Sequence, residues 1–140
     1  MIYTINTIQI KLNIKDKPFE KVSSPEAIYA IAKNIFASLD DDQEHFVMFA
    51  LDSINQIKGY KIITSGGQNN ASPDIKIIFR NALLLGAISI IVAHNHPSGN
   101  CKPSIEDKAF TLKLKAAGKL IEIEVLDHII LGDNTFERIV

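Results

Sequence analysis

Residues 88–93, ISIIVA, constrain the fold more than any other part of the chain, because this short run is almost wholly apolar. Such a run is typical of a strand that is buried on both faces, in the middle of a sheet covered by helices. A polar stretch with two histidines and a proline follows it directly. We therefore expect functional side chains at the carboxyl end of a central strand.

The rest of the chain alternates strand patterns with helix patterns. Apolar runs and period-two alternation predict further strands at residues 8–14, 46–51, 57–64, within 120–131, and at the edge in 136–140. Serine caps predict three helices, the first opened by a capping box. The first helix is expected from the capping box of Ser23 and Glu26 to about Leu39, and the second from Ser72 onward. The third is expected from Ser104 to a C-cap at Gly118. The prediction is a single α/β domain over residues 1–140, with a mixed sheet and packed helices.

Composition narrows the class of protein. The net charge is −1 over 140 residues, without the basic excess usual for nucleic-acid proteins. One cysteine, Cys101, cannot form an internal disulfide, which favours a reducing compartment. The N-terminus lacks the pattern of a signal peptide, and no apolar run approaches the length of about 20 residues that crosses a bilayer. We expect a cytoplasmic protein with no membrane association.

The strongest chemical signal is His94-x-His96, followed after seven residues by Ser104-x-x-Asp107. Residues two apart on an extended chain point the same way, so both imidazoles can reach one point at the end of the strand. Pro97 to Gly99 can reverse the chain, and the next helix then presents Asp107 on its first turn. Two histidines and one carboxylate form a catalytic zinc set that leaves one position open. These residues predict one zinc ion per chain.

Simpler interpretations exist for each half of this pattern. Ser104 with Asp107 is also an ordinary helix N-terminus, and a lone His-x-His is more often at the surface. The combination favours a metal, because unpaired imidazoles beside a buried strand would be costly. Other His-x-His folds fit worse: amidohydrolase barrels are longer, cupins are all-β, β-lactamase-like enzymes need more histidines, and nucleobase deaminases need a cysteine pair.

At these residues the chain resembles a known family. The spacing is that of the JAMM (MPN+) metallopeptidase motif, and HNHPSG, PSIED and LDHIIL resemble its RadC branch. The segments EHFVMFALD and IFRNALLLGAISIIVAHNHPSG agree, so the resemblance covers roughly residues 20–135. It implies a cytidine-deaminase-like α/β fold, a zinc site, and hydrolysis of peptide or isopeptide bonds.

The resemblance also implies roles for individual residues. His94, His96 and Asp107 would be the metal ligands, and Ser104 would help to hold the water or the developing oxyanion. The upstream catalytic glutamate of the family falls on Glu44. By itself Glu44 would be a solvated residue after three aspartates, but a hydrolase of this type needs a carboxylate that is not a ligand.

Four further residues have less certain roles. An Asp-His pair recurs in the RadC pattern and falls here on Asp127 and His128. At most one of the two can face the site, where it would either orient a ligand or take part in ordinary hydrogen bonding. Cys101, which stands where the family usually has proline, is expected to be a free loop cysteine, although a thiolate there could reach the zinc. His45 is expected at the surface.

Three functions remain open from the sequence. The first is a zinc metallopeptidase or deconjugase-like hydrolase acting on an unknown peptide or protein. The second is a module associated with DNA repair, with little or no turnover. RadC proteins commonly carry a helix-hairpin-helix region that this sequence starts too late to include, so we expect only weak DNA binding. The third is a structural zinc domain.

Overall fold

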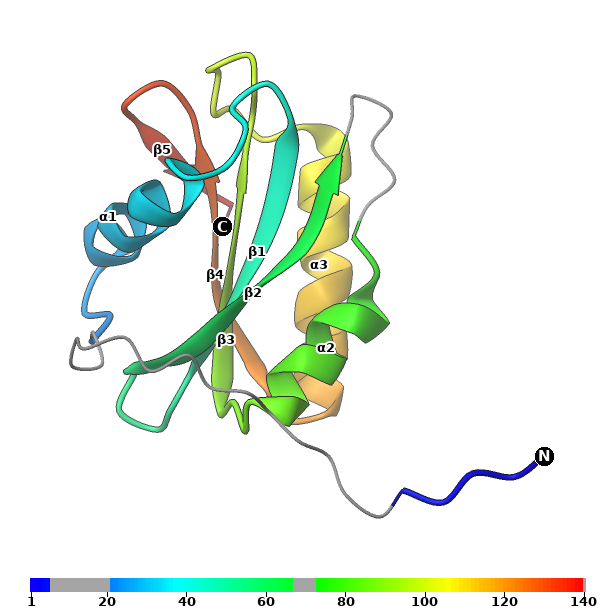
Figure 1. Ribbon diagram of the computed structural model, residues 1–140. Helices are drawn as coiled ribbons and strands as arrows, with labels where there is room; N and C mark the ends of the chain where they lie inside the picture. Colours follow the sequence, from blue (N-terminus) through cyan, green and yellow to red (C-terminus); the bar gives the residue numbers. More distant parts are fainter. Residues whose placement is uncertain (6–20, 67–72, 140) are drawn as a thin grey trace.

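The computed structural model describes residues 1–5, 21–66 and 73–139. The strand predicted at 8–14, the cap at Ser72 and the terminal Val140 lie outside these residues. The chain forms one mixed sheet with helix α1 on one face and helices α2 and α3 on the other (Figure 1). The bounds are α1 (Pro25–Phe36), β1 (Glu44–Leu51), β2 (Ile57–Gly66), α2 (Ile75–Leu84), β3 (Ser89–Asn95), α3 (Ile105–Leu120), β4 (Glu124–Leu131) and β5 (Phe136–Arg138). This confirms the predicted α/β class.

The strand order places the apolar run at the middle of the sheet. The order is β2-β1-β3-β4-β5, with β3 antiparallel to β1 and parallel to β4. Residues 89–93 of β3 are all buried, as predicted from their composition, and so is His94. Ile88, the first residue of the predicted strand, instead precedes β3 and is 57% exposed. The short β5 lies at the edge, beside β4, which confirms the predicted edge strand. Among the described residues no helix has the length and apolar character needed to cross a membrane.

Alternating residues of the central strands β1 and β3 pack into two separate hydrophobic cores, one on each face of the sheet. Phe46, Met48 and Val92 pack toward α2 and α3. Val47, Phe49 and Ala93 pack toward α1. Because neighbouring strand residues face opposite ways, each face of β3 ends in a different environment. His94 continues the α3 face, and Asn95 continues the α1 face.

The N-caps of the first two helices lie one and two residues after the predicted serines. The N-cap of α1 is Ser24, whose hydroxyl accepts from the Ala27 amide, so the predicted capping box of Ser23 and Glu26 is wrong. Helix α1 also ends at Phe36, three residues before Leu39. The N-cap of α2 is Asp74. Ser23 and Ser24 are both cap-forming residues, so the sequence pattern alone does not decide between them.

Helix α3 begins at Ser104 as predicted, but Gly118 is not its cap. The helix continues to Leu120, and Gly118 is a buried residue within it. A Cβ at Gly118 would lie 2.4 Å from the carbonyl oxygen of Ile123, so glycine is needed there for close approach. The left-handed residue that ends the helix is Glu122, with φ 61°. The amides of Glu122 and Ile123 return to Lys119 and Gly118, which is a Schellman termination.

Candidate metal centre

The sheet register brings the start of β1 beside the end of β3. Phe46 pairs with His94 across these antiparallel strands, so Glu44 at the first position of β1 lies next to the residues that follow β3. The ring of Phe46 stacks on that of His94 with centroids 5.9 Å apart. Two segments that are distant in the sequence therefore contribute side chains to one end of the sheet.

Asn95, the residue between the two histidines, connects the end of β3 to the start of β1 by hydrogen bonds. Its amide oxygen accepts from the backbone N–H of His45 at 2.7 Å, and its amide nitrogen donates to the carbonyl of Gln43 at 2.8 Å. These bonds hold the residues on both sides of Glu44. No sequence pattern marks this role, because only the register of the strands reveals it.

Helix α3 supplies the second carboxylate. Ser104 and Asp107 form a reciprocal capping box, in which the serine hydroxyl accepts from the Asp107 amide at 3.0 Å. One carboxylate oxygen of Asp107 accepts from the Ser104 amide at 2.9 Å. The cap thus performs the ordinary task of a helix start and also aims the carboxylate toward the end of β3.

Four side chains converge at this end of the sheet. Potential ligand atoms of Glu44, His94, His96 and Asp107 all lie within 4.8 Å of one another. The two histidine Nε2 atoms are 3.1 Å apart, and they lie 3.3 Å and 3.2 Å from the two carboxylate oxygens of Asp107. Ligand atoms around a tetrahedral zinc ion are separated by about 3.3 Å, because Zn–N and Zn–O distances are about 2.0–2.1 Å. The three predicted ligands therefore fit such an ion in atom type and spacing.

Glu44 stands slightly apart from these three. Its nearer oxygen is 3.8 Å from His94 Nε2. A carboxylate at this place can act either as a fourth ligand or as a proton acceptor beside the ion.

The cluster shifts the pKa values of its own members. Burial would raise the pKa of Asp107, but hydrogen bonds with His94 and His96 outweigh it and hold the pKa well below the usual range. The hydrogen bond to Asp107 raises the pKa of His96, against the smaller effect of burial. Asp107 therefore remains an anion, which is the state that a cation needs.

Of the pair Asp127-His128, only His128 faces the site. Its Nε2 lies 2.7 Å from His94 Nδ1. Asp127 points away from it and accepts from Arg138 Nε at 2.9 Å. Burial, followed by the charge of His94, lowers the pKa of His128 well below its ordinary value, so this ring is neutral. Thr111, which no sequence motif marks, bonds to the far side of the His128 ring at 2.7 Å.

Other predicted positions have different outcomes. His45 is not at the surface: only 4% of it is exposed, and its two ring nitrogens bond to Ser65 Oγ and to the Asp40 carbonyl. The period-two pattern could not reveal these partners. Cys101 packs against Gly132 and is not among the four converging side chains. The Ser104 hydroxyl contacts the Asp107 amide, and its role toward an oxyanion stays a prediction.

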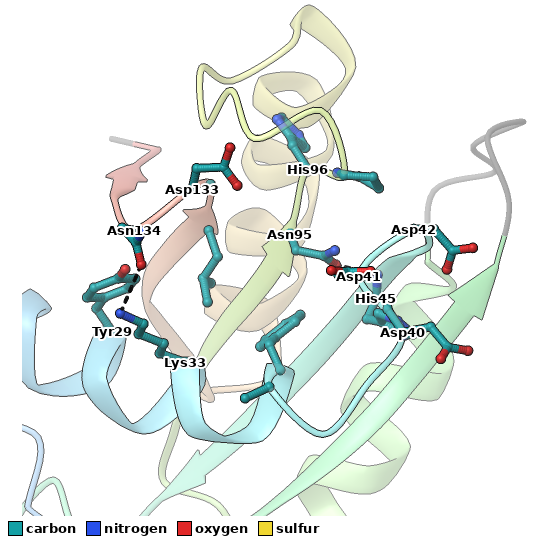
Figure 2. A pocket seen from close by; sticks show the side chains of 15 residues that line it. Tyr29, Lys33, Asp40, Asp41, Asp42, His45, Asn95, His96, Asp133 and Asn134 are labelled. Carbon is teal, nitrogen blue, oxygen red and sulfur yellow. Dashed lines mark hydrogen bonds between the residues drawn. The ribbon is translucent and has the colours of Figure 1, made fainter.

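A cavity of about 580 Å³ opens on the α1 side of this end of the sheet. Figure 2 shows His96 at its upper edge, with Asp40, Asp41 and Asp42 at one side and Asp133 with Asn134 at the other. Lys33 of α1 reaches across to Asn134 at 3.4 Å. Glu44, His94 and Asp107 do not line it. The cavity therefore adjoins the cluster through His96, the one member of the group that lines it.

Comparison with known proteins shows the family of this chain. Residues 22–138 match the model of the family described as RadC-like JAB domain. Relatives named UPF0758 protein are 46% identical over 94 residues in Carboxydothermus hydrogenoformans, 36% over 122 residues in Methanosarcina mazei, and 40% over 116 residues in Clostridium perfringens. The aligned segments cover 67%, 86% and 83% of this chain, but 42%, 52% and 50% of those relatives. The chain thus spans about half the length of the curated relatives that it matches. It belongs to the RadC-like JAB domain family.

Proposed function

We propose that this chain is a zinc-dependent hydrolase of peptide or isopeptide bonds. The observation that carries the proposal is the arrangement of the two carboxylates. Asp107 lies 3.2–3.3 Å from both histidine Nε2 atoms, whereas Glu44 stands 3.8 Å from His94 Nε2 at the border of the group. Three ligands with one adjacent carboxylate are the donor set of a hydrolytic site, in which one group does not bind the ion.

In this proposal His94, His96 and Asp107 hold the ion. A bound zinc ion would lower the pKa of water to about 7 and polarise a carbonyl group. Glu44 then accepts a proton from the attacking water and transfers it to the nitrogen of the leaving amine, while the amide C–N bond breaks and a C–O bond forms. The Ser104 hydroxyl already accepts from the Asp107 amide, so its hydrogen remains free to donate to the developing oxyanion.

Replacement of Glu44 by glutamine tests this division of roles. The Glu44→Gln variant keeps the shape but cannot take up the proton, so it should retain one zinc ion per chain and lose about 100-fold or more in rate. Metal content is measured on purified protein, and rates on a panel of peptides and lysine-linked isopeptides. Glu106→Gln is the matched control, because Glu106 is an exposed glutamate beside Asp107 in α3 and is not in the cluster.

Each other outcome identifies a different function. Loss of zinc from Glu44→Gln would make Glu44 a fourth ligand, as in a structural zinc site. Zinc-loaded wild-type protein that cleaves nothing on the panel, and whose cobalt-substituted visible spectrum does not respond to a hydroxamate, would contradict a hydrolase. The accessory role in DNA repair would then be tested by titration against duplex and single-stranded DNA.

A further inference from the structure

We propose that Thr111 and His128 are positioning residues that set the tautomer of His94, placing its proton on Nδ1 and leaving Nε2 free to bind a metal ion. This deepens the proposed function, since it assigns the residues that prepare one ligand. It rests on three consecutive hydrogen bonds whose directions are determined by chemistry.

The first bond determines where the Thr111 hydroxyl hydrogen lies. Thr111 Oγ1 is 2.7 Å from the carbonyl oxygen of Asp107, one helical turn earlier in α3. A carbonyl can only accept, so the single hydroxyl hydrogen must point to it. Oγ1 therefore has only lone pairs left to offer to any other neighbour.

The second bond determines the tautomer of His128. Its Nδ1 lies 2.7 Å from Thr111 Oγ1, which can now only accept. His128 must consequently carry its proton on Nδ1, and its neutral ring has a lone pair on Nε2. Thr111 and His128 are only 2% and 1% exposed, so water is not available to replace either partner.

The third bond transmits this choice to His94. The lone pair on His128 Nε2 faces His94 Nδ1 at 2.7 Å, so the proton between the rings belongs to His94 Nδ1. His94 Nε2 then faces His96 and Asp107, and its lone pair is the one that a metal ion would take. The ring of Phe46 packs against both imidazoles, with centroids 5.9 Å from His94 and 5.5 Å from His128. The packing holds both rings in the orientation that the bonds require.

His96 reaches the same state by a separate route. Its Nδ1 lies 2.8 Å from the carbonyl oxygen of Asn100, which can only accept a proton. The two histidines are thus prepared in the same way, one by a backbone carbonyl and the other through Thr111 and His128. Partners of this kind raise metal affinity because they remove the wrong tautomer from competition.

Removal of the Thr111 hydroxyl tests the assignment. Thr111→Val keeps the shape of the side chain but leaves His128 Nδ1 without its acceptor, whereas Thr111→Ser retains the hydroxyl as the matched control. Two quantities are measured: the imidazole ¹⁵N chemical shifts of His94 and His128 in metal-free protein, and the dissociation constant for zinc by chelator competition. Circular dichroism and urea unfolding establish that each variant folds.

The wild type and Thr111→Ser should show His128 protonated on Nδ1 only and His94 protonated on Nδ1. In Thr111→Val the proton of His128 should move to Nε2, and zinc should bind about 10- to 100-fold more weakly. A wild-type His128 protonated on Nε2, or a Thr111→Val variant with unchanged shifts and zinc affinity, would overturn the assignment. If the wild type binds no zinc, the proposed function fails, but the nitrogen shifts still decide whether Thr111 sets the tautomers.

Discussion

At the scale of single residues, the two histidines of the site are equivalent in the sequence motif and different in the fold. His94 is 1% exposed and bonds through Nδ1 to a second buried imidazole, whereas His96 is partly exposed and bonds through Nδ1 to a backbone carbonyl. Both arrangements direct Nε2 toward Asp107. Burial lowers the pKa of a histidine, whereas a hydrogen bond to a carboxylate raises it. The first effect prevails at His128 and the second at His96, so the two residues change the stability in opposite directions with pH.

The stability of the metal-free protein should pass through a maximum near pH 6.5. The hydrogen bond to Asp107 raises the pKa of His96 above 6.5, so the stability it contributes below pH 6.5 is lost as the pH rises through the raised value. Burial lowers the pKa of His128 below 6.5, so the unfolded chain binds more protons and stability is lost as the pH falls below 6.5. Urea unfolding in the presence of a chelator, from about pH 5 to about pH 8, measures the acidic limb of this profile below pH 6.5 and the alkaline limb above it.

The variant Asp107→Asn separates the two limbs. It removes the main cause of the raised pKa of His96, so the alkaline limb should flatten while the acidic limb, which depends on His128, remains. A wild-type free energy of unfolding that continues to rise up to the highest pH measured would contradict this explanation.

At the scale of elements, α3 contributes to the site from its first turn while its last turn determines where β4 begins. The capping box at Ser104 aims Asp107, and Thr111 stands one turn further along the same helix. The Schellman termination after Leu120 then returns the chain to the sheet, where β4 places His128 opposite Val92. A change at the far end of α3 can therefore alter the position of His128.

The substitution Gly118→Ala should destabilise the protein by about 1–3 kcal/mol, as overpacking usually does. Helix propensity alone predicts the opposite sign, a gain of about 1 kcal/mol. The clash should prevail, because the new Cβ would lie 2.4 Å from the Ile123 carbonyl oxygen in the connection to β4. Urea unfolding measures the change, and Ala116→Gly at an exposed position of the same helix measures the propensity term separately. Increased stability in Gly118→Ala would show that this close contact is absent.

At the scale of the whole molecule, the cluster joins three parts of the fold. Glu44 comes from β1, the histidines from the end of β3, and Asp107 from α3. An ion held by His94, His96 and Asp107 would link the end of β3 to α3, the helix that covers one core. Such a ligand binds the folded chain in preference to the unfolded one, since the unfolded chain does not bring these groups together.

Zinc should therefore raise the free energy of unfolding of the whole chain. The expected gain is about 2.7 kcal/mol when free zinc is 100 times its dissociation constant. Urea unfolding with and without zinc measures it, and His96→Ala should abolish the gain because one of three ligands is lost. The same gain in His96→Ala would place the bound zinc elsewhere on the protein.

Features that depend on short-range order could be predicted from the amino-acid sequence. Composition identified the central strand β3 from residues 89–93, although it wrongly included Ile88, and periodicity identified the α/β class. His94, His96 and Asp107 could be paired from spacing because a strand end, a turn and a helix start bring nearby residues together without help from the rest of the fold. Resemblance to a family, and no physical pattern, pointed to Glu44, since it belongs to a distant segment.

Features that depend on sheet register and on packing could not be predicted in this way, because they arise from contacts between distant segments. Pairing of Phe46 with His94 places Glu44 at the cluster, and the parallel register of β4 places His128 behind His94. The burial of His45, the choice of Ser24 as cap and the continuation of α3 through Gly118 have the same origin. Local propensities differ by about 1 kcal/mol or less, so contacts between elements determine which local alternative is adopted.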